Sequence, residues 1–146
     1  MELPIKAFKL EGYDGKIGLY IEEVFGFPNE RSFHGGYDMK GKLIIEVGCY
    51  KVDYDNYYFS TSNLSNFLSE LESCYEVLSG SAQYKDDYEQ DLMFELEMKE
   101  SGHTKIVGSF QSNLAIGNEL KFELNSDQSY LVYTIEDIRN VLELFG

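Results

Sequence analysis

The chain has 146 residues, with 26 Asp and Glu against 12 Lys and Arg, which gives a formal net charge of −14 at pH 7. A chain this acidic repels phosphate backbones, so composition excludes nucleic acid and other polyanions as partners and favours a cationic protein. Hydrophobic content of 43% and aromatic content of 15% suffice for a packed core and argue against disorder. We therefore expect a single domain over residues 1–146.

The N-terminus and the cysteines predict a cytoplasmic protein. The first ten residues lack the basic start and apolar run of a signal peptide, and no apolar stretch is long enough to cross a membrane. Two cysteines, Cys49 and Cys74, are too few for a disulfide framework. We expect both to be buried free thiols, because free cysteine behaves as a small hydrophobe.

The first part of the chain has the alternating apolar pattern of β-strands. The expected strands cover residues 5–11, 17–22, 43–54 and 57–60. Asp14-Gly15 is a hairpin signal between the first two strands, and a Gly-containing loop is expected over 24–38. Asp55-Asn56 suits a turn after the long strand.

An amphipathic helix follows these strands. Six apolar residues from Leu64 to Leu78 fall on one helical face. Ser62 or Asn63 is expected to cap its start, and Gly80 lies just after its end, where a left-handed residue is needed.

The rest of the chain returns to strands and ends in a second helix. The expected strands cover residues 82–85, 91–99, 106–110 and 120–124. A C-terminal helix is expected over 135–145, with Thr134 and Asp137 approximating a capping box. The sum is an α+β fold of about seven to eight mainly antiparallel strands, with one central and one C-terminal helix. We find no internal sequence repeat.

The sequence contains no evident catalytic set, and we expect no enzymatic activity, no cofactor and no metal site. His34 and His103 lie in Gly-flanked segments and have no partners at metal-ligand spacing. A pair of carboxylates facing each other across a cleft would not be visible in a sequence with this many acids. An unrecognised carboxylate site therefore stays open as an alternative.

Acidic and tyrosine residues gather in two segments, 50–58 and 84–91, on either side of the first helix. Surface tyrosines offer rigid contact area, and carboxylates steer a basic partner. The candidate contact residues are Asp53, Tyr54, Asp55, Tyr57, Asp86, Asp87, Tyr88, Glu89 and Asp91. The other interpretation is that these tyrosines pack on the sheet and the acids only keep the surface soluble.

Several segments in order resemble one protein family. They are Gly12-Tyr13-Asp14 with Gly18-Leu19, Phe25-Gly26-Phe27, Glu46-Val47-Gly48 with Tyr50, the helix from Phe67 to Tyr75 leading to Leu78-Ser79-Gly80-Ser81-Ala82, and Ser126-Asp127-Gln128-Ser129-Tyr130-Leu131. Over nearly the whole chain they resemble the WapI family of small bacterial immunity proteins. We expect a structural role for Asp127 and Gln128, whose side chains would hydrogen-bond the turn leading into Tyr130.

The resemblance implies an intracellular protein that binds and neutralises the toxic C-terminal domain of a cell-wall-associated, contact-dependent toxin. Such domains are commonly nucleases acting on RNA, and the resemblance implies no cofactor. It carries over no motif for toxin contact. The first hypothesis is thus an immunity protein that occludes a basic toxin domain through its acidic, Tyr-rich surface.

The second hypothesis is a small cytoplasmic ligand-binding or housekeeping domain. A pocket with an apolar lining and two convergent carboxylates would favour it. The oligomeric state stays open, because unpaired edge strands could support a dimer but are often shielded by charge.

Overall fold

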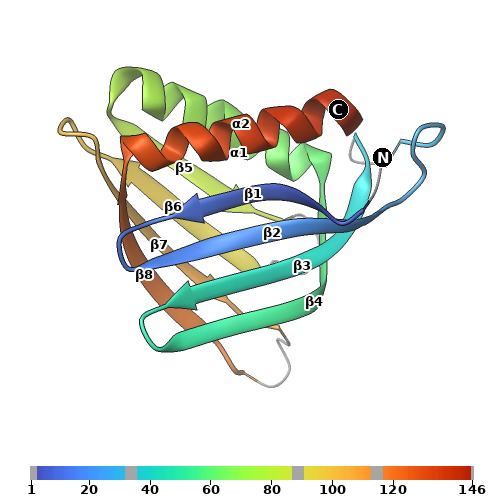
Figure 1. Cartoon of the computed structure of the whole chain (residues 1–146), viewed down its shortest axis with the longest axis horizontal. Helices are drawn as coiled ribbons and strands as arrows, with labels where there is room; N and C mark the ends of the chain where they lie inside the picture. Colours follow the sequence, from blue (N-terminus) through green and yellow to red (C-terminus); the bar gives the residue numbers. More distant parts are fainter. Residues whose placement is uncertain (1–2, 32–35, 87–90, 113–116, 146) are drawn as a thin grey trace.

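The computed structural model describes residues 3–31, 36–86, 91–112 and 117–145. These residues form eight strands in two four-stranded antiparallel sheets, together with two helices (Figure 1). The first sheet and its helix comprise β1 (Ile5–Glu11), β2 (Gly15–Val24), β3 (Asp38–Val47), β4 (Tyr50–Ser60) and α1 (Thr61–Val77). The second set comprises β5 (Gly80–Lys85), β6 (Leu92–Met98), β7 (His103–Phe110), β8 (Leu120–Asp127) and α2 (Gln128–Phe145). The α+β prediction, with mainly antiparallel sheet, is confirmed.

The chain passes through the same order of elements twice, four consecutive strands and then a helix. Strand order in each sheet follows chain order. α1 packs against β5, the first strand of the second sheet, whereas α2 returns to pack against β1 (Figure 1). Each helix therefore covers the sheet that it does not follow, and the two halves complete one another.

The core lies between the sheets and under the helices. Inward residues alternate along the strands, as in β6, where Leu92, Phe94, Leu96 and Met98 are buried. Phe8 of β1, Phe67 of α1, Tyr84 of β5 and Phe94 of β6 form an aromatic cluster, with ring centroids 5.3–6.4 Å apart. Because its rings come from both sheets and a helix, this cluster ties the two halves together.

The long strand expected over 43–54 is in fact two strands. Val47 pairs with Tyr50 around a two-residue turn at Gly48-Cys49. Gly48 has a φ of 59°, which suits glycine at the first central position of a type II′ turn. The turn places Cys49 at the surface, so the expectation of a buried thiol is wrong for Cys49 and confirmed for Cys74.

The turn expected at Asp55-Asn56 is a β-bulge within β4. Leu43 pairs with Tyr54 and Gly41 with Tyr57, so Asp55 and Asn56 both lie opposite the residue between Gly41 and Leu43. The extra residue reverses the alternation of side chains, and Tyr57 therefore points into the core instead of outward.

α1 begins at Thr61, one residue after its cap. Ser60 accepts a hydrogen bond from the Asn63 backbone N–H, and the Asn63 side chain accepts one from the Ser60 backbone N–H. The expected cap at Ser62 or Asn63 is therefore wrong by two or three positions, and Asn63 is the reciprocal partner in a capping box. The left-handed residue that ends the helix is Leu78 rather than Gly80.

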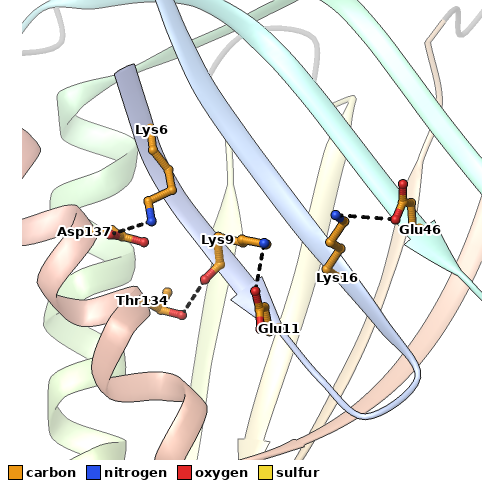
Figure 2. A network of polar contacts seen from close by, with 7 residues as sticks. All are labelled: Lys6, Lys9, Glu11, Lys16, Glu46, Thr134 and Asp137. Atoms are coloured by element: carbon orange, nitrogen blue, oxygen red, sulfur yellow. Dashed lines mark hydrogen bonds and ion pairs between the residues drawn. The ribbon is translucent and has the colours of Figure 1, made fainter. Parts of the chain in front are cut away.

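α2 begins at Gln128, about two turns before the expected start at residue 135. Thr134 is therefore a residue of the helix, and its hydroxyl donates to the Lys9 carbonyl of β1 at 2.9 Å. The ion pair between Lys6 and Asp137, at 3.2 Å, lies on the same side of β1 (Figure 2). These contacts dock α2 along the edge of the first sheet.

The β1–β2 turn is clasped to the end of β8. The Tyr13 N–H donates to the Asn125 carbonyl at 2.8 Å, and the Asn125 N–H donates to Asp14 Oδ1 at 3.0 Å. A Cβ on Gly12 would lie 2.3 Å from the Asn125 carbonyl oxygen, so only glycine allows this approach. We call residues 11–14 together with residues 125–127 the clasp.

Asp127 joins the clasp to α2. Its carboxylate accepts hydrogen bonds from the Ser129 N–H at 2.8 Å, from the Ser129 hydroxyl and from the Tyr13 hydroxyl. These donors, the Ser129 hydroxyl first, hold the pKa of Asp127 below its usual range. Asp127 therefore has the structural role that was expected, and this role is to cap the N-terminus of α2.

We predict that Asp127→Ala lowers the free energy of unfolding by about 1 kcal/mol at pH 7, because α2 loses its cap. The pKa of Asp127 is lowered in the folded state, so its contribution is present above the unfolded pKa and is lost as pH falls through the folded one. Urea denaturation should show the difference from wild type shrinking between pH 5 and pH 2. Glu123→Ala on exposed β8 surface is the control, expected within about 0.5 kcal/mol of wild type. An equal loss in both variants would contradict the capping role.

Candidate functional site

The structure brings the two acidic, Tyr-rich segments together, but in the interior. The Tyr57 hydroxyl of β4 donates to Asp86 Oδ2 at 2.9 Å and lies 2.9 Å from the Tyr84 hydroxyl of β5. The Leu92 N–H also donates to Asp86, at 3.4 Å. This buried network links the first sheet to the second.

Three of the candidate contact residues are therefore buried. Tyr57 and Asp86 are 1% exposed and Asp91 is 7% exposed, so the expectation that their side chains face a partner is wrong in this structure. Burial, together with neighbouring Tyr84 and Asp86, raises the pKa of Tyr57 well above its usual value of 10. Three other candidates lie outside the described residues: Asp87, Tyr88 and Glu89.

The remaining candidates lie on β4. The side chains of Asp53 and Asp55 are 47% and 70% exposed on the outer face of the first sheet, and both contact Lys42 Nζ, at 3.3 and 3.7 Å. The hydrogen bond to Asp53 raises the pKa of Lys42. Tyr54 is half-buried, with its ring 5.4 Å from that of Phe110. Asp53 and Asp55 thus form the accessible part of the candidate site.

Acidic and basic side chains form ion pairs on the first sheet, whereas the two helices carry mostly acidic side chains. On the first sheet, lysines alternate with acids in cross-strand and neighbouring ion pairs, such as Lys16–Glu46 and Lys9–Glu11 (Figure 2). α1 carries three glutamates and no basic residue, and α2 carries three acids against Arg139, which pairs with Glu72. The helices therefore contribute strongly to the long-range negative field.

Three pockets formed by the described residues fall short of the site that the second hypothesis needs. The pocket of about 230 Å³ between β1 and α2 has the carboxylates of Glu11, Glu136 and Asp137, but the rest of its lining is Lys6, Lys9 and two tyrosines rather than aliphatic side chains. The pocket of about 340 Å³ at the start of α1 is lined by Arg31 and polar residues and by no carboxylate. The groove between the helices is lined by glutamates together with Tyr75, Val132 and Ile135. Its volume of about 200 Å³ is below the roughly 300 Å³ at which small-molecule sites begin. Within the described ranges, no group of three or more His, Cys, Asp and Glu side chains is placed to hold a metal ion.

The sequence of residues 9–146 matches the model of the Immunity protein WapI-like family. The chain belongs to this family. Membership in this immunity protein family implies a toxin as the partner protein and a non-catalytic role. Comparison with curated proteins and with solved structures found no match. Of the helices in the described ranges, none is long and apolar enough to span a membrane.

The segments that carry the family resemblance build the scaffold of this WapI-like protein. Gly12-Tyr13-Asp14 and the segment from Ser126 to Leu131 meet in the clasp. The Ser126 hydroxyl donates to the Glu11 carbonyl at 2.6 Å, and Leu131 is fully buried. These segments therefore make contacts within the protein that join the β1–β2 turn to the end of β8.

We predict that Tyr57→Phe lowers the free energy of unfolding by about 1–3 kcal/mol, because buried Asp86 loses a hydrogen-bond donor. Tyr58→Phe is the matched control: Tyr58 is adjacent in β4 but 46% exposed, and its variant should stay within about 0.5 kcal/mol of wild type. Chemical denaturation measures both. Equal stability of the two variants would show that the buried network contributes nothing.

Proposed function

We propose that this WapI-like protein neutralises a basic toxin domain, a nuclease, by binding it and occluding its active surface. Family membership carries the proposal, and the net charge of −14 supports it. A nuclease holds phosphates in a cationic groove, and an acidic protein is electrostatically complementary to such a groove. The protein would act in the cytoplasm, without catalysis or a cofactor.

The outer face of β4 is the contact surface we propose. Asp53 and Asp55 provide accessible carboxylates on this face, where Tyr58 is 46% exposed, and Tyr50 is 63% exposed at the hairpin end of the same strand. Aromatic anchors next to acids suit an interface with a basic protein. Lys42 neutralises only part of the charge of the two aspartates.

Growth rescue tests the function directly. The toxin domain encoded beside this gene is expressed with and without the full chain, and the two proteins are then purified through a tag on one of them. We expect growth to be restored and a stoichiometric complex to be recovered. No rescue together with no complex would contradict the proposal.

We predict that Asp53→Ser with Asp55→Ser lowers the association rate with the toxin domain by about tenfold at low salt, because steering charge is removed at the contact. Glu95→Ser with Glu97→Ser removes the same charge from the exposed face of β6 and should have a much smaller effect. Stopped-flow measurements from low to high salt should show the difference closing as screening increases. Equal rates for the two variants would remove β4 from the contact surface.

A further inference from the structure

Three of the four strands that end a sheet have their edges occupied. On β1, the Lys9 carbonyl accepts a hydrogen bond from Thr134 of α2. On β5, the Gln83 N–H donates to Glu70 Oε1 of α1 at 3.1 Å. On β8, the N–H and carbonyl of Asn125 are both held by the clasp. The protein thus covers the edges that would otherwise pair with other chains.

β4 differs from these three strands, because its edge is not covered at the end next to the β3–β4 turn in the described residues. Within the sheet it pairs only with β3, and Val47 and Tyr50 flank the two-residue turn. Residues that flank such a turn form a hydrogen-bonded pair, and the pattern then alternates along the strand. The backbone N–H and carbonyl groups of Lys51 and Asp53 therefore point away from β3. In the part of the chain that the structure describes, no hydrogen bond reaches these outward groups.

We propose that a strand of the bound toxin domain pairs with β4 at residues 51–53 and extends the first sheet. The inference rests on the proposed function and adds the mode of binding. Main-chain hydrogen bonds would supply affinity, and side chains on alternate positions would supply selectivity. Tyr50, which is 63% exposed, flanks this edge as an aromatic contact.

Charge selects a basic strand rather than a second copy of this chain. Two copies paired through this edge would bring together chains that each carry a net charge of −14, and in a register that places Asp53 opposite its own equivalent the two carboxylates would also repel each other. Like charges on paired strands are destabilising, whereas a basic strand would meet Asp53 and Asp55 favourably. The acidic edge therefore resists self-association and accepts a cationic partner.

Lys51 allows the backbone to be tested separately from the charge. Its side chain is 59% exposed and lies 3.8 Å from Glu46, so its removal costs little stability. Lys51→Ala keeps the N–H, and Lys51→Pro removes it at a position where an edge strand tolerates proline. For a basic partner, loss of the lysine charge alone favours binding. Strand addition predicts that the Ala variant binds the toxin domain at least as tightly as wild type and that the Pro variant binds about tenfold more weakly.

Amide exchange in the wild-type chain gives a second readout that does not depend on how the variants fold. We expect the Lys51 and Asp53 amides to be exposed in the free protein and protected in the complex. If wild type rescues growth but both variants bind alike and these amides stay exposed, strand addition is overturned and the proposed function stands. If protection depends on concentration in the free protein, the occupant is a second copy and the inference is wrong. If wild type neither rescues nor binds, both proposals fail together.

Discussion

The clasp between the β1–β2 turn and the end of β8 is the contact on which the rest of the fold depends. It brings the backbone of Tyr13 to that of Asn125, which requires glycine at position 12. It also places Asp127 where it caps α2, and α2 then runs back over β1. This contact, between residues 111 positions apart in the sequence, thus joins the two sheets, fixes where the last helix begins and covers a sheet edge. Two of the segments that carry the family resemblance, Gly12-Tyr13-Asp14 and the one that begins at Ser126, meet in this contact.

Local patterns predicted the elements, but not every boundary or every buried side chain. Alternation and helical spacing depend on neighbours in sequence, and they located β1, β6 and α1 well. The Gly48-Cys49 turn and the bulge after Tyr54 depend on pairing between strands: apolar alternation concealed the turn, and the interruption at Asp55-Asn56 was predicted as a turn instead of a bulge. α2 was predicted to begin too late although Leu131 already lies on its buried face, because the cap that fixes its first residue depends on Asp127 and on the contact of Asp127 with Tyr13.

The same distinction, between local sequence pattern and contacts distant in sequence, applies to the residues of the candidate site. Asp53 and Asp55 were predicted as contact residues because charged side chains favour the surface, and the structure exposes both. The burial of Tyr57 and Asp86 arises only where two sheets distant in sequence meet, and a sequence segment rich in acid and tyrosine gives no sign of it. The repeated order of four strands and a helix is already present in the predicted elements, but the pairing of the strands into two separate sheets is visible only in three dimensions.

The central claim is a division of labour, in which the clasp holds the fold and the β4 edge meets the toxin. The most direct test is the affinity of Asp127→Ala for the toxin domain, measured by calorimetry at a temperature where the variant is fully folded. We expect the affinity to equal that of wild type although the variant is less stable. A loss of affinity of about tenfold in the folded variant would show that the clasp itself contacts the toxin, and would contradict the account.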